Sequence, residues 1–96
     1  MSLAAVLLHF EKVAPVARFF FHHCNGRDTL ADPDGRLVPD LHAIAVIALR
    51  EARWLISQEA LQGNIELTQS IEVRDTRGAI VHTLQFRDAV SVGDRT

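Results

Sequence analysis

The sequence predicts a small α+β domain of two layers, in which one long helix packs on a sheet of short strands. Residues 40–62 carry apolar side chains at intervals of three and four, which is typical of an amphipathic helix. Aromatic or alternating apolar residues on both sides of this segment, separated by turns that contain glycine, indicate strands. The expected order is strand, short strand, helix, strand, strand, preceded by an extra amphipathic helix at the N-terminus.

The composition indicates one folded domain. Its 96 residues suffice for one core and are too few for two. With 48% hydrophobic residues and a formal net charge of -2, the chain is neither disordered nor strongly basic. We therefore expect no nucleic-acid partner and no membrane partner, because both favour clustered lysine and arginine. The single cysteine excludes an intrachain disulfide and is compatible with the cytoplasmic location expected by default.

Residues 1–16 are expected to form a helical extension of the domain. Ser2 can cap a helix over residues 3–13, and Pro15 ends it. The segment lacks the basic start of a secretory signal, so we expect none. We expect the helix to pack on apolar surface that the long helix leaves uncovered. Its apolar side chains at helical spacing are Leu3, Val6, Leu7 and Phe10.

Residues 17–24 are predicted to form the first strand, which ends at the turn dipeptide Asn25-Gly26. Phe19 and Phe21 lie on one face of this strand and Phe20 on the other, because successive side chains alternate. A strand with aromatic rings on both faces is expected to be central and covered on both sides.

The segment Asp-Pro-Asp-Gly at residues 32–35 predicts a turn. The acidic residues here do not match the ligand spacing of a calcium-binding loop, so turn chemistry explains them better. Leu37 and Val38 can add a brief edge strand to the first strand. Pro39 limits that edge strand, because it has no backbone donor.

The long helix is predicted over residues 40–62, with Asp40 as its N-cap and Gly63-Asn64 as its stop. Alanines in its apolar stripe allow the helix axis to approach a sheet closely. If the first strand and the strand after the helix are adjacent, they should be parallel, with a right-handed connection. The stripe consists of Leu41, Ile44, Ala45, Ala48, Ala52 and Leu55, and Glu59 follows at the same spacing.

The last part of the domain is predicted to be a β-hairpin with strands at residues 67–74 and 79–87. Gly78 supplies the left-handed backbone that the intervening loop requires. The domain is expected to span residues 17–92, with a weakly ordered segment from Asp88 onward and a tail at 93–96. The side chains predicted to face the core are Leu67, Gln69, Ile71 and Val73 on one strand and Ile80, His82, Leu84 and Phe86 on the other.

Five motifs are spaced along the chain: Phe-Phe-Phe-His, Asp-Pro-Asp-Gly-Arg-Leu-Val-Pro-Asp-Leu, the spaced alanines of the helix, Ile-Glu-Val-Arg-Asp-x-x-Gly and Leu-Gln-Phe-Arg-Asp-Ala-Val. Together they resemble a small bacterial domain family known as a domain of unknown function. The resemblance covers residues 17–92 and implies a fold but no catalytic residue. Ile47 and Trp54 depart from the family pattern, in which polar side chains are expected. The layout also resembles the partner-neutralising domain of HicB-type antitoxins, a likeness of element order alone.

A small-ligand or metal site is the alternative to a purely structural role for the histidines. His22 and Cys24 share a face of the first strand and are ordinary ligands of zinc or copper, with His82 or Asp28 as a further ligand. The competing interpretation is a hydrogen-bonded strand histidine at His22 and a neutral core histidine at His82. A nucleophilic pair of Cys24 and His82 lacks a third orienting group. We therefore expect no enzyme activity, no bound metal and no cofactor.

Ile47 and Trp54 predict an interaction surface on the long helix. They are seven residues apart and share a face displaced from the stripe that covers the sheet. Arg50 and Glu51 flank them as rim charges. The N-terminal helix of the same chain is the alternative cover for this surface. The leading hypothesis is a non-enzymatic interaction or regulatory module that forms a homodimer or binds another protein.

Five arginines offer a weaker alternative, a basic patch for RNA or DNA. Acidic residues alternate with them along the chain, which favours a solvated surface of mixed charge. The arginines considered are Arg50, Arg53, Arg74, Arg77 and Arg87.

Overall fold

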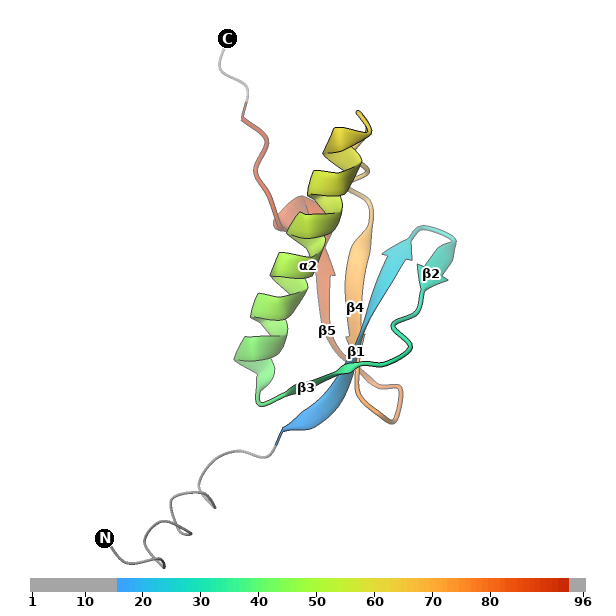
Figure 1. Cartoon of the computed structure of the whole chain (residues 1–96), viewed down its shortest axis with the longest axis vertical. Helices are drawn as coiled ribbons and strands as arrows, with labels where there is room; N and C mark the ends of the chain where they lie inside the picture. Colours follow the sequence, from blue (N-terminus) through green and yellow to red (C-terminus); the bar gives the residue numbers. More distant parts are fainter. Residues whose placement is uncertain (1–15, 94–96) are drawn as a thin grey trace, which may run out of the picture.

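The fold is a sheet covered on one face by one long helix (Figure 1). The computed structural model describes residues 16–93, and the predicted helix at residues 3–13 lies outside them. The predicted α+β class is confirmed, with five antiparallel strands in one sheet. The elements are β1 (Ala17–Asn25), β2 (Asp28–Leu30), β3 (Arg36–Val38), α2 (Leu41–Leu61), β4 (Ser70–Arg74), β5 (Ile80–Gln85) and the short 3-10 helix η1 (Phe86–Asp88).

The strand β1 lies inside the sheet, in the order β2-β1-β4-β5, with β3 also paired to β1. β1 and β4 are antiparallel, with Phe21 opposite Val73. The expectation of a parallel pair was therefore wrong. The reason is that β3, not β1, leads into the helix, and β3 itself runs antiparallel to β1.

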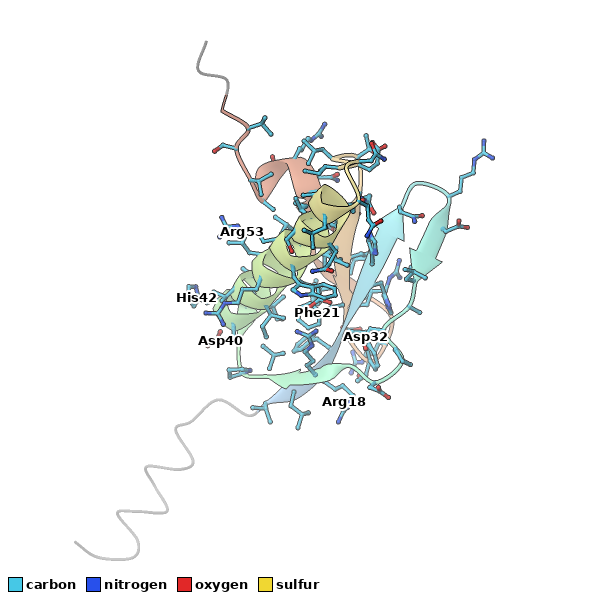
Figure 2. The ribbon with its side chains drawn as sticks, turned by 45° about the horizontal axis from the view of Figure 1, so that its top comes forward. Arg18, Phe21, Asp32, Asp40, His42 and Arg53 are labelled. Carbon is cyan, nitrogen blue, oxygen red and sulfur yellow. The ribbon has the colours of Figure 1, made fainter. Side chains whose placement is uncertain are left out.

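The core lies between α2 and the inward faces of the strands. Figure 2 shows Phe21 pointing into this space. The side chains of Ala48 and Ala52 are fully buried, so the predicted alanine stripe is part of the helix face that covers the sheet. Leu41 is 68% exposed, against expectation, because side chains in a first helical turn point back past the end of the helix. The buried apolar residues are Phe21, Val38, Ile44, Ala48, Ala52, Ile56, Ile71, Val73, Phe86 and Ala89.

Both ends of α2 follow the predicted signals. The Asp40 carboxylate accepts a hydrogen bond from Ala43 N–H at 2.7 Å and so caps the first turn. Gly63 has a φ of 83°, the left-handed conformation that ends a helix after its C-cap.

The C-terminal hairpin contains a bulge that the alternation of its sequence does not reveal. The register between β4 and β5 shifts at Val73, so that His82 lies opposite Val73 and Ile80 opposite Arg74. Val81, the residue left over, packs against the core. Ile80 therefore lies on the outer face and is 53% exposed, which corrects the expectation that it faces the core.

The segment after β5 is better anchored than predicted. Ala89 is buried and Val90 packs against the core, so the weakly ordered segment does not begin at residue 88. The Nε of Arg53, labelled in Figure 2, donates a hydrogen bond to the Ala89 carbonyl at 2.7 Å. Small apolar residues and a contact with the helix hold this segment, and neither gives a periodic signal in the sequence.

The sheet face opposite α2 is called here the open face. Phe20, His22 and Cys24 of β1 lie on it, because their neighbours Phe21 and His23 oppose the core residues Val73 and Ile71. Gly35, in the loop at residues 31–35, lies close to the Phe20 ring on this face. The predicted inner position of β1 in the sheet is confirmed. The predicted cover of the open face, a helix at residues 3–13, lies outside the described residues.

Candidate interaction surface

The side of α2 that points away from the sheet carries the residues that the sequence singles out for an interface. Trp54 is 60% exposed, and Ile47 is half-buried and packs against the edge of the core. Leu61, seven residues beyond Trp54, is 78% exposed. Sequence reasoning missed Leu61, although the same spacing of seven identifies it. We call Ile47, Trp54 and Leu61 the outer ridge.

Contacts within the domain occupy both flanks of the outer ridge. The Nη2 of Arg36 on β3 lies 2.9 Å from the Glu51 carboxylate on one side of the helix. On the other side, Arg53 Nε donates a hydrogen bond to the Ala89 carbonyl. Glu51 is thus paired within its own chain, and Arg50 is an exposed charge beside the ridge. A partly exposed ion pair such as Arg36–Glu51 adds about 0–1 kcal/mol to stability and mainly orients the two side chains.

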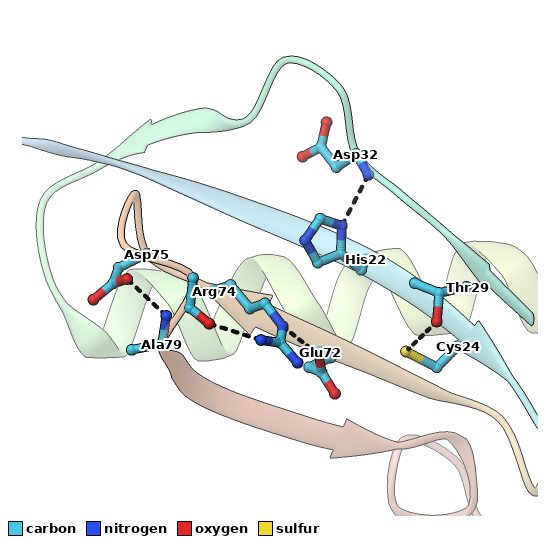
Figure 3. A network of polar contacts seen from close by, with 9 residues as sticks. His22, Cys24, Thr29, Asp32, Glu72, Arg74, Asp75 and Ala79 are labelled. Atoms are coloured by element: carbon cyan, nitrogen blue, oxygen red, sulfur yellow. Dashed lines mark hydrogen bonds and ion pairs between the residues drawn. The ribbon is translucent and has the colours of Figure 1, made fainter.

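The arginines of the basic-patch alternative do not form one surface of free charge. Arg74 lies 2.6 Å from the Glu72 carboxylate and also donates to the Gly78 carbonyl at 2.7 Å (Figure 3). In the same hairpin, the Asp75 carboxylate accepts hydrogen bonds from Arg77 and Ala79 N–H. These contacts shape the loop and place opposite charges side by side.

The structure separates the residues of the alternative ligand site. His22 and Cys24 lie on the open face, whereas His82 opposes the buried Val73 and so lies on the helix face. Within residues 16–93, no group of three His, Cys, Asp or Glu side chains is placed to hold a metal ion. His22, Cys24 and His82 are therefore not brought together.

His22 and Cys24 instead take part in local contacts on the open face. His22 Nδ1 accepts a hydrogen bond from Asp32 N–H at 3.0 Å (Figure 3), which places the ring proton of a neutral imidazole on Nε2. The His22 ring also stacks on Phe20, with centroids 6.3 Å apart. Cys24 is a free, half-buried thiol whose Sγ lies 3.8 Å from the Thr29 hydroxyl.

Asp32 closes a gap in the sheet edge. β2 pairs with residues 23–25 of β1 and β3 with residues 17–19, so residues 20–22 lack a strand partner on that edge. The Asp32 carboxylate takes the place of that partner and accepts a hydrogen bond from Phe21 N–H at 3.2 Å. Its other oxygen accepts from Asp34 and Gly35 N–H at 3.2 and 3.1 Å, which confirms the predicted turn.

These contacts also determine the acidity of Asp32. Burial by itself raises the pKa of this carboxyl group. The hydrogen bonds from Phe21, Gly35 and Asp34 and the charge of Arg36 outweigh burial and lower the pKa below its ordinary value. Asp32 is therefore an ionised structural group at neutral pH, with its oxygens engaged by backbone donors.

A buried polar cluster joins β1, the residue before β4 and the last part of α2. Gln69, only 4% exposed, accepts a hydrogen bond from His23 Nε2 on its amide oxygen at 2.6 Å. Its amide nitrogen donates to the Glu59 carboxylate at 2.6 Å and to the Glu66 carbonyl at 2.8 Å. The His23 ring stacks on Phe86, with centroids 5.5 Å apart. The second oxygen of Glu59 is buried and has no partner among the described residues.

Sequence reasoning missed this cluster. Its one signal was a glutamine at an inward strand position, Gln69, because a buried amide needs partners. The partners could not be named, since His23 lies 46 residues away in the chain.

The fold and the ridge define a small α+β domain. One helix packs on one face of an antiparallel sheet and exposes apolar side chains on its side away from the sheet. The comparison with protein families matched the Domain of unknown function (DUF6894) over residues 18–87, and the chain belongs to this family. No curated protein and no solved structure matched the chain. Within the described residues, no helix has the length and apolar run needed to cross a membrane.

Proposed function

We propose that the domain is a non-enzymatic protein-interaction module whose contact surface is the outer ridge of α2. The observation that carries this proposal is the exposure of Trp54 and Leu61 in line with Ile47 on the helix face that its own sheet does not use. Burying a large apolar side chain contributes about 1.5–3 kcal/mol, and tryptophan is a favoured anchor in interfaces. The exposed Arg50, between Ile47 and Trp54 in the chain, adds a charge to this surface.

The polar clusters support structural roles rather than catalysis. The carboxylate of Asp32 is occupied by backbone donors, and the amide of Gln69 bridges two elements of the core. A catalytic group needs a free face toward a substrate. A non-enzymatic module in the cytoplasm also agrees with the single free thiol of Cys24.

The test compares ridge variants with a matched control on the same helix. Trp54→Glu with Leu61→Glu places two charges on the ridge, whereas Leu41→Glu changes a leucine of similar exposure in the first turn. Light scattering of the full chain at increasing concentration reports the mass, and circular dichroism reports the fold. We expect the mass of the wild type and of the control to exceed 10.7 kDa, and that of the double variant to stay at this value. Equal masses for the wild type and the double variant would contradict self-association through the ridge.

A further inference from the structure

We infer that the partner of the outer ridge is a second copy of this chain, with the two α2 helices side by side and antiparallel. This inference rests on the proposed function and adds the identity and the orientation of the partner. Its basis is the pattern of side chains along the ridge, which complements itself in one orientation.

The ridge is part of a longer seam with the spacing of a coiled coil. Its positions alternate in steps of four and three residues, which keeps a line of side chains on one side of a helix. The central part of the seam is accessible, since Arg50, Trp54 and Ser57 are exposed. The seam consists of Ala43, Ile47, Arg50, Trp54, Ser57 and Leu61.

An antiparallel pair centred near residue 52 uses every position of this seam. Ala43 then lies opposite Leu61 of the second copy, and Ile47 lies opposite Ser57. In both pairs a larger apolar side chain meets a small one, as packed cores require. The Ser57 hydroxyl already donates to the Trp54 carbonyl of its own helix at 2.6 Å, so it is not left without a partner when covered.

The arginine within the seam distinguishes the two orientations. In the antiparallel pair, each Arg50 lies opposite Trp54 of the second copy, where a guanidinium group can stack on an indole ring. In a parallel pair of the same helices, Arg50 would lie opposite Arg50, which is repulsive. The seam therefore favours the antiparallel orientation.

Contacts within the domain lie at the flanks of the seam, whose exposed residues are Arg50, Trp54, Ser57 and Leu61. Arg36 and Glu51 join one flank to β3, and Arg53 joins the other to the segment after η1. Close approach of a second helix, at about 8–10 Å between axes, is thus expected on the remaining outer side.

Cysteine trapping tests both the partner and its orientation, in a full-length chain that carries Cys24→Ser. Equal amounts of Ala43→Cys and Leu61→Cys chains are mixed under mild oxidation, and each chain is also oxidised alone. In the antiparallel pair, position 43 meets position 61 of the second copy. The two positions 61 are then about 27 Å apart, from 18 residues at 1.5 Å of rise, far beyond disulfide reach. We expect the mixture to form a disulfide-linked dimer of twice 10.7 kDa and Leu61→Cys alone to remain monomeric on a non-reducing gel.

A matched control uses His42→Cys mixed with Leu61→Cys. Position 42 precedes Ala43 and is exposed, but it is turned by about 100° around the helix, away from the seam. We expect little disulfide in this mixture. Arg50→Glu should also weaken the dimer, whereas Arg27→Glu, an equal change of charge at the tip of the β1–β2 turn, should not.

The other outcomes overturn the inference in distinguishable ways. Efficient trapping of Leu61→Cys alone, with a dimer that Trp54→Glu disperses, would show a parallel pair on the same ridge. That result would leave the proposed function standing. A full chain that stays monomeric while a chain lacking residues 1–14 dimerises would identify residues 1–14 as the cover. Monomers in every variant would exclude a second copy as the partner.

Discussion

Gly35 is the position where the turn at residues 31–35 depends most on the absence of a side chain. Its φ is 69°, and a Cβ added there would lie 2.9 Å from the Phe19 carbonyl oxygen and 3.0 Å from a ring atom of Phe20. Gly78 has a similar φ of 84°, but a Cβ there would meet nothing within 4 Å. The two glycines therefore separate the cost of backbone conformation from the cost of close approach.

Gly35→Ala should destabilise the domain clearly more than Gly78→Ala. Left-handed backbone costs alanine about 1–2 kcal/mol. The reduced entropy of the unfolded chain offsets about 0.4–1 kcal/mol of this cost. At Gly35 the contact with Phe19 and Phe20 adds about 1–3 kcal/mol, as overpacking does. The difference between the two variants is thus about 1–3 kcal/mol, and each kcal/mol lowers the melting temperature by about 4–8 °C in a domain of this size.

Urea denaturation followed by circular dichroism measures both variants against the wild type. An unchanged slope with a lower midpoint would show that stability, rather than the extent of unfolding, has changed. Equal losses for Gly35→Ala and Gly78→Ala would refute the idea that the turn is packed against β1 at Gly35.

Four further expectations concern other parts of the domain. Ala48→Leu should cost about 1–3 kcal/mol by overpacking, whereas the exposed Ala60→Leu should be nearly neutral in the same urea titration. Gln69→Leu should cost about 1–3 kcal/mol, because it leaves buried polar partners unsatisfied; a neutral result in thermal melting would contradict the cluster. The lowered pKa of Asp32 contributes stability above the ordinary pKa of aspartate, and this contribution disappears as the pH falls through the folded-state pKa. The stability lost in Asp32→Asn should therefore be larger at pH 7 than at about pH 3, and an equal loss at both would argue against the carboxylate's role. Cys24 should titrate as one free thiol in denatured, unreduced protein, and the absence of a thiol would be incompatible with this structure.

Local signals were enough to predict the long helix. Asp40 supplies the first cap, Gly63 supplies the left-handed residue after the last turn, and the alanine stripe marks the buried face. Each of these signals acts within a few residues, so a sequence pattern contains it. The alternation of Ile71 and Val73 identified the inward face of β4 in the same way.

Features that depend on distant pairing could not be predicted. The bulge that turns Ile80 outward exists only because β4 and β5 pair out of step. The direction of β1 relative to β4 depended on which strand leads into α2. The cluster around Gln69 joins residues far apart in the chain, and its partners follow only from the fold. On the candidate surface, spacing alone identified Ile47 and Trp54, but their exposure depends on where the sheet and the C-terminal segment lie.

The two edges of the sheet differ in whether another strand can pair along them. The loop that carries Asp32 accounts for the difference. On the border formed by β2 and β3, five residues of the connecting loop stand opposite three of β1, so the row of backbone donors and acceptors is broken. A foreign strand could not run straight along it. The border formed by β5 carries no charged residue in Ile80–Gln85 and no proline. Among the described strands, β5 therefore offers the unbroken edge, and we expect that shortening the loop at residues 31–35 would make the opposite edge available for pairing as well.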